Sequence, residues 1–131
     1  DLLLKPRQLL GVLNMDLIKW FCQKLGINTK LIRSSELRAE GAKVSRLINI
    51  CRAIKANSYL STLGAKDYID ENNLFNDYGI ELCYQNYSHP QYKQIYGDFI
   101  PYMSIIDLLL NEGNASLEII RSGQRENIKG T

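Results

Sequence analysis

The sequence lacks the large positive charge and the long apolar run that mark nucleic-acid-binding and membrane-spanning proteins. It contains one histidine, one tryptophan and two methionines, and its 16 Lys and Arg face 14 Asp and Glu, which leaves a net charge of only +2. A surplus this small predicts no nucleic-acid partner and no attraction to a membrane surface. The longest apolar run, at 104–110, is far shorter than a membrane-spanning helix. We expect a soluble protein without a membrane span.

The three cysteines are isolated from one another. Cys22, Cys51 and Cys83 each lie in an apolar stretch, and none has a Cys-x-x-Cys or Cys-His spacing. An odd count without a motif predicts reduced thiols in a cytoplasmic protein, with Cys51 and Cys83 buried. We expect no metal site, because the single histidine and the scattered thiols lack ligand spacing. No glycine-rich phosphate loop or nucleophile motif occurs, so the sequence leaves the cofactor unknown.

The composition is that of one globular domain. Hydrophobic residues make up 45% and charged residues 23% of the 131-residue chain, values close to the globular average. We expect a single α/β domain over 1–131, with a polar, frayed tail at 124–131. The chain starts at Asp1 inside a run typical of the middle of a protein. It is therefore expected to be the carboxyl-terminal portion of a longer chain.

The apolar spacing alternates between helical and strand periods. Helices are predicted at 7–25, 43–54 and 65–76, and strands at 29–33, 58–61 and 80–85. This order predicts a three-layer α/β fold in which a small, mostly parallel sheet is flanked by helices. The polar stretch 34–36 would follow the first strand, at the sheet edge where α/β proteins hold ligands.

The chain loses its periodicity between 86 and 102. Six of the eight tyrosines lie from Tyr78 to Tyr102, which predicts an ordered, irregular, Tyr-rich loop that either stacks on a sugar or base or packs on itself. Ser104 is a predicted N-cap for a helix that ends at Gly113, and 114–122 is a final short helix.

Two residues near this loop can carry chemistry. His89 can titrate near neutrality and reach a ligand, or it can simply fix the turn before Pro90. Asp107 lies on an otherwise apolar helix, so it is either an exposed first-turn residue favoured by the helix dipole or a carboxylate paired with His89, Lys43 or a ligand. At the start of the second predicted helix, Lys43 and Arg46 offer cations for a phosphate.

Four blocks of the sequence share a pattern with one family. They are Lys43 to Leu47 with Ile50 to Ala53, Tyr59 to Ser61 with Tyr68 to Asp70, His89-Pro90-Gln91-Tyr92 with Gln94, and Phe99 to Gly113. The last is the most specific, because it follows Phe-x-Pro-x-x-Ser-x-x-Asp-Leu-Leu-Phe-Asn-x-Gly with Leu110 at the second Phe. Over about 16–123 the chain resembles the carboxyl-terminal part of the bacterial WbqC-like family. It departs at Thr62, where the family commonly has Gly.

The resemblance implies a role in O-antigen or other surface polysaccharide biosynthesis. If the protein is an enzyme, it is then a transferase that acts on an activated, nucleotide-linked or lipid-linked sugar, with His89 and Asp107 as catalytic residues. The ligand-binding positions carried over are Lys43, Arg46, Ser61, Tyr92, Ser104 and Asn111. An amino-terminal segment of the same protein or another subunit would complete the site. The alternative is a non-catalytic assembly module whose Tyr-rich loop is a protein interface.

Overall fold

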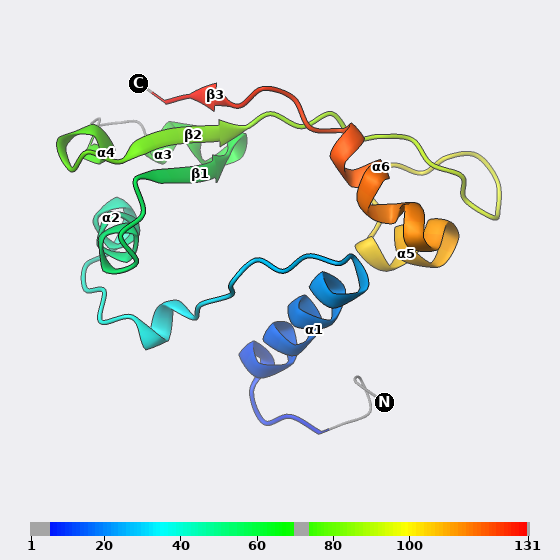
Figure 1. Cartoon of the computed structure of the whole chain (residues 1–131), viewed down its shortest axis with the longest axis horizontal. Coiled ribbons are helices and arrows are strands. Elements are labelled where there is room, and N and C mark those ends of the chain that lie inside the picture. Colours follow the sequence, from blue (N-terminus) through cyan, green and yellow to red (C-terminus); the bar gives the residue numbers. More distant parts are fainter. Residues whose placement is uncertain (1–5, 70–73, 131) are drawn as a thin grey trace. The chain divides into compact units, whose positions relative to one another are not determined.

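A computed structural model describes residues 6–69 and 74–130 (Figure 1). The chain folds into two compact units. The first combines Asp1–Leu31 with Pro90–Ser122, and the second combines Ile32–His89 with Gly123–Thr131. Each unit therefore draws on both halves of the sequence. The expectation of a single domain over the whole chain stays a prediction.

The second unit contains a three-stranded sheet with the order β1-β2-β3. Strand β1 (Ser58–Thr62) pairs in parallel with β2 (Glu81–Gln85), in a register that sets Ser58 opposite Glu81 and Thr62 opposite Gln85. A 3₁₀ turn at Leu63–Ala65 and the helices α3 (Lys66–Ile69) and α4 (Leu74–Asp77) lie between these strands in the chain. The predicted α/β character and the parallel pairing of these two strands are confirmed.

The core of this unit lies where helix α2 (Lys43–Ala53) packs with the β1–β2 region. The 3.6-residue spacing of α2 buries Ile48 and Cys51. Phe75 from α4 is buried and stacks on Tyr59 with ring centroids 5.2 Å apart, and Tyr84 in the central strand has no exposed surface. The remaining members of the core are Ala65, Ile69, Ile80 and Leu82.

The strand predicted at 29–33 is wrong. These residues form neither helix nor strand, and they lead to a 3₁₀ turn at Ser34–Glu36. In the part of the chain that the structure describes, no strand pairs with this short β-prone run. Leu31 and Ile32 are both exposed. Strand propensity describes how well side chains fit a sheet. A segment of high propensity forms a strand only where another strand pairs with it. The polar stretch 34–36 therefore follows no strand.

The third strand comes from a segment for which no strand was predicted. Strand β3 (Ile128–Lys129) runs antiparallel to β2, with Tyr84 opposite Ile128. The polar composition of 124–131 predicted a frayed tail, but the backbone of Gly130 also donates a 2.8 Å hydrogen bond to Leu82. The sheet is thus mixed, not mostly parallel. The sequence did not predict β3, because a short edge strand pairs through its backbone and needs no apolar pattern in its side chains. The three-layer arrangement stays a prediction.

Two further expectations have mixed outcomes. Helix 65–76 is represented by α3 and α4, while the intervening 70–73 lie outside the described residues. All three cysteines are free of disulfides; Cys51 is buried as predicted, whereas Cys83 is only half-buried. Burial raises the pKa of the Cys51 thiol.

The first unit contains helices α1 (Leu10–Lys24), α5 (Ile105–Glu112) and α6 (Ser116–Ser122). The predicted start and end of α5 are confirmed: the Ser104 hydroxyl accepts a 3.3 Å hydrogen bond from the backbone of Ile106, and Gly113 ends the helix with φ of +51°. The buried Ser116 hydroxyl donates to the Gly113 carbonyl at 2.6 Å and so fixes the turn into α6. No helix among the described residues has the length and apolar character needed to cross a membrane.

Candidate functional site

The irregular segment 90–104 is held to one face of α5 by side-chain hydrogen bonds. The backbone N–H of Lys93 donates to Glu112 at 2.9 Å, and that of Ile95 donates to Asn111 at 3.1 Å. Asn111 in turn donates to the backbone carbonyl of Asp107 at 2.8 Å. Helical geometry places the side chains at positions 107 and 111 on one face of α5, one above the other. This face offers hydrogen-bond acceptors to the backbone N–H groups of segment 90–104, which lies outside helices and strands.

Asp107 is the polar centre of this arrangement. Its Oδ2 atom accepts a 2.7 Å hydrogen bond from the Tyr92 hydroxyl and a 3.0 Å hydrogen bond from the Gln94 amide. Among the described residues of this unit, no donor contacts Oδ1 and no cation pairs with the carboxylate. Within the described part of this unit, the carboxylate therefore keeps an open oxygen and a negative charge that neutral donors only partly offset.

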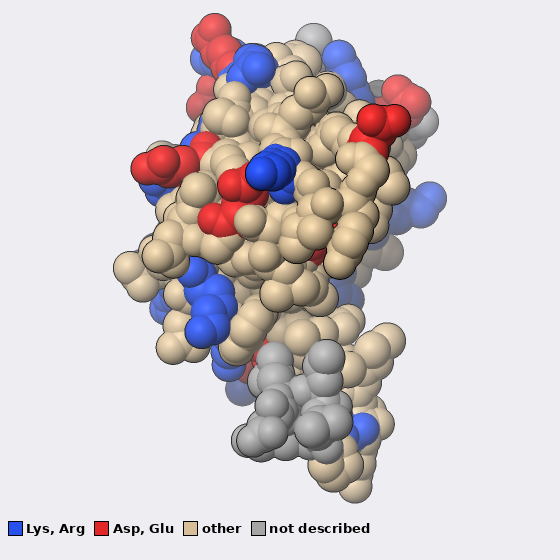
Figure 2. Space-filling view, turned by 90° about the vertical axis from the view of Figure 1, so that its right-hand side faces the viewer, with Lys and Arg blue, Asp and Glu red and all other residues tan. Residues whose placement is uncertain are grey.

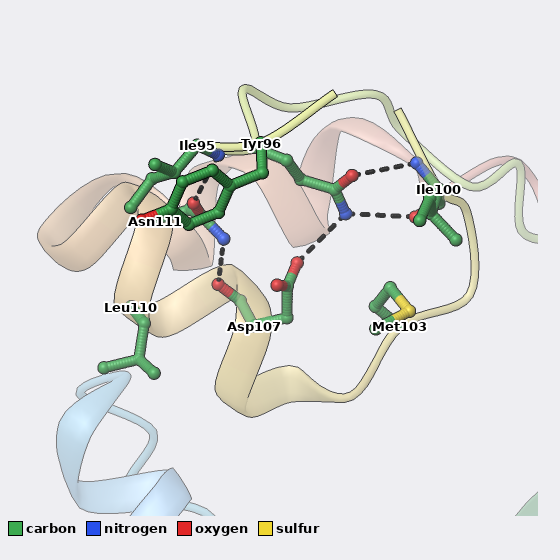
Figure 3. Close-up of a pocket in the computed structure, with 8 residues that line it drawn as sticks. Ile95, Tyr96, Ile100, Met103, Asp107, Leu110 and Asn111 are labelled. Atoms are coloured by element: carbon green, nitrogen blue, oxygen red, sulfur yellow. Dashed lines mark hydrogen bonds between the residues drawn. The ribbon is translucent and has the colours of Figure 1, made fainter. Parts of the chain in front are cut away.

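Gln94 also closes the segment on itself. Its Oε1 atom accepts a 2.8 Å hydrogen bond from the backbone of Ile100, and its Nε2 atom donates to the Ile100 carbonyl at 3.0 Å (Figure 3). The Gln94 side chain thus makes two hydrogen bonds to the backbone of Ile100, as a residue of a paired strand would, and closes the loop 94–100. This loop is fixed to Asp107 by the same amide group.

A cavity of about 290 Å³ opens between this loop and α5. The labelled side chains of Figure 3 show the Asp107 carboxylate rising from α5 toward the chain above it, with the Tyr96 ring near Asn111. The polar residues that line the cavity are Gln94, Asp107 and Asn111, and the other lining residues are Ile95, Tyr96, Ile100, Met103 and Leu110. The cavity is therefore lined mainly by apolar side chains and contains one carboxylate.

The phenol of Tyr92 is held in its neutral form. Burial raises its pKa, the hydrogen bond to Asp107 and the negative charge there raise it further, and the contact with Gln94 lowers it. The ring also packs edge-on against Phe99 at 5.3 Å. Tyr92 thus acts as a hydrogen-bond donor to Asp107 and is a poor proton acceptor at neutral pH.

The structure brings together four of the residues singled out from the sequence. Tyr92, Asp107 and Asn111 join one hydrogen-bonded network, and Ser104 caps the helix that carries two of them. Gln94 and Tyr96 also line the cavity but were not among the site residues named from the sequence, although Tyr96 belongs to the Tyr-rich loop that was predicted either to bind a ligand or to pack on itself. Gln94 stood inside the family-like block around His89, so its position was visible although its two-sided contact with Ile100 was not.

The other four predicted residues belong to the second unit. Lys43 and Arg46 are exposed on the first turn of α2, Ser61 is buried in β1 beside the Tyr59 hydroxyl, and His89 is half-buried next to Pro90. Their roles as ligands, and the pairing of His89 with Asp107, stay predictions.

Charges of both signs share the surface shown in Figure 2. Lys and Arg are interspersed there with Asp and Glu, and other residues cover most of this face. Such mixing creates no extended field of one sign on this face.

The comparisons with known proteins place the chain in a family. The model of the WbqC-like protein family matches residues 1–119. A relative from Mycobacterium tuberculosis (strain ATCC 25618 / H37Rv), named "Uncharacterized protein Rv1507c", is 35% identical over 113 residues, which cover 86% of this chain and 48% of that protein. The chain thus spans about half the length of this curated relative. No solved structure matches the chain.

This chain belongs to the WbqC-like protein family. The resemblance seen in the sequence is thereby confirmed at the level of the family.

Proposed function

We propose that this protein binds an activated sugar and takes part, in the cytoplasm, in surface polysaccharide biosynthesis by group transfer. The observation that carries the proposal is the Asp107 carboxylate, which keeps one oxygen open at the cavity between α5 and the 94–100 loop. Sugar recognition needs a few fixed polar groups beside apolar and aromatic surface. Asp107, Asn111 and Tyr96 supply both kinds of contact.

The size of the cavity favours part of a nucleotide sugar over the whole molecule. Small-molecule sites commonly measure about 300–1,000 Å³, and this cavity, at about 290 Å³, lies at the lower limit. One sugar ring is the expected occupant. The sequence supplies the rest of the proposal, in which Lys43 and Arg46 are phosphate ligands and His89 is the proton-transfer residue.

Calorimetric titration with nucleoside-diphosphate sugars tests this proposal. A hydrogen bond to a charged group contributes about 1.5–3 kcal/mol, so Asp107→Asn should weaken binding by about tenfold or more. The matched control is Asp98→Asn, since Asp98 is an exposed carboxylate of the same segment that does not line the cavity. Equal affinity in both variants, or no binding by the unmodified protein, would contradict the proposal.

The second candidate is a non-catalytic assembly module. It is favoured by the exposure of Tyr96 and Tyr102, at 86% and 82%, because large exposed aromatic side chains are enriched at protein interfaces. The two candidates differ in their response to small molecules. A melting-temperature screen with nucleotide sugars and acyl-CoA should show stabilisation only for the sugar-binding function.

A further inference from the structure

Among the described residues of the first unit, no contact compensates the negative charge of Asp107. A single oxygen, Oδ2, accepts both side-chain hydrogen bonds, from Tyr92 and from Gln94. A neutral amide at position 107 would offer one oxygen to the same two donors. The position in the first turn of α5 favours a carboxylate through the helix dipole, but that interaction leaves Oδ1 open. As far as the described residues of this unit go, the negative charge and the second oxygen are thus open to a ligand.

We propose that the sugar bound in this cavity carries a positively charged amino group, which pairs with Oδ1 of Asp107. This inference rests on the proposed function and narrows its substrate class to amino sugars with a free amine. A hydroxyl group would hydrogen-bond to Oδ1 but leave the charge uncompensated, whereas an ammonium group supplies both a donor and the opposite charge.

The surroundings of Asp107 strengthen such a pair. Ile95, Ile100 and Leu110 line the cavity with exposed apolar surface. A sugar bound there would displace water from this surface, and charges attract more strongly where water is displaced. The Tyr96 ring lines the same cavity (Figure 3), and its face attracts an ammonium group by a cation–π interaction. Asn111 uses one amide hydrogen on the Asp107 carbonyl, which leaves the other for a sugar hydroxyl.

The test compares amines with their acetylated forms. The probes are nucleoside-diphosphate hexoses with a free amine at carbon 2, 3 or 4, each paired with its N-acetyl derivative, and calorimetry gives the affinities. At least one amine should bind about tenfold more tightly than its acetylated partner, and this preference should shrink as salt is raised. Asp107→Asn should abolish the preference, while Asp98→Asn should retain it.

A second pair of variants leaves Asp107 in place. Leu110 is 78% exposed at the cavity, so Leu110→Lys sets a competing cation there with little risk to folding. It should lower the affinity for the amine about tenfold. Ile106→Lys is the matched control, because Ile106 is an exposed residue of the same helix that does not line the cavity.

The outcomes separate this inference from the proposed function. If acetylated or unsubstituted nucleotide sugars bind through Asp107 as tightly as the amines, the amino-sugar inference is overturned while the proposed function stands. If no nucleotide sugar of either kind binds, both are overturned.

Discussion

The hydroxyl of Tyr92 donates a 2.7 Å hydrogen bond to the carboxylate of Asp107. This bond ties an irregular segment to the first turn of α5 and leaves the outer carboxylate oxygen open to the cavity. The fold and the proposed site therefore depend on the same contact.

Removing only the Tyr92 hydroxyl should destabilise the protein. Tyr92→Phe keeps the ring against Phe99 but deletes a donor to a charged acceptor, so the free energy of unfolding should fall by about 1–2 kcal/mol. Urea denaturation measures this change. Tyr96→Phe is the control and should shift the free energy by less than about 0.5 kcal/mol, because Tyr96 is exposed. Equal losses in both variants would show that the Tyr92 bond does not support the fold.

Gln94 should control the opening of the 94–100 loop. Gln94→Leu removes both hydrogen bonds to the Ile100 backbone, so the Ile100 amide should exchange its hydrogen at least about tenfold faster. Hydrogen exchange read by NMR gives this rate. In the control Gln91→Leu, which alters an exposed residue of the same segment, unchanged exchange is expected. Unchanged exchange in Gln94→Leu itself would disprove the closure.

Gly123 should not tolerate a side chain. A Cβ atom there would come within 2.5 Å of the Ser88 carbonyl oxygen and 2.7 Å of the Tyr87 ring. Gly123→Ala should therefore lower the free energy of unfolding by about 1–3 kcal/mol. Gly64→Ala meets nothing within 4 Å and serves as the control in the same thermal denaturation series. A stable Gly123→Ala protein would mean that Gly123 lies farther from Tyr87 and Ser88 than the structure places it.

Stability should decline at alkaline pH. Burial raises the pKa values of Tyr59, Tyr87 and Tyr92 above the ordinary value of 10.0. The folded state thus favours the neutral phenols, and this stabilisation is complete below pH 10 and is lost as the pH rises through the higher folded-state values. Urea unfolding between pH 8 and pH 11 measures the decline, which Tyr59→Phe should reduce. A free energy of unfolding that stays constant between pH 8 and pH 11 would contradict the raised pKa values of these tyrosines.

The sequence predicted the elements that have a strong internal signal. The apolar spacing of α1 and α2, and the cap and stop residues Ser104 and Gly113 of α5, are local properties, so no knowledge of the fold was needed. Residues 29–33 and β3 show the opposite case. Whether a short run becomes a strand depends on a pairing partner far away in the sequence, which propensity does not record.

The candidate site was only partly visible for a similar reason. Asp107 stood out as a charge among apolar residues, and Tyr92 as one of many tyrosines in an irregular segment. The role of Gln94 in closing the loop did not stand out, because a side chain that closes a loop through backbone atoms leaves no periodic pattern. The cavity beside Asp107 exists only once that loop is closed.

The most direct test of the sugar-binding proposal is an NMR titration of the protein with nucleoside-diphosphate sugars. The account predicts that the largest shifts fall on the backbone amides of Ile95, Tyr96 and Ile100 and on the side-chain amides of Gln94 and Asn111. It also predicts that Asp107→Asn needs about tenfold more sugar, or still more, to reach half of these shifts. Saturable binding whose shifts all lie away from this cavity, or no binding at all, would contradict it.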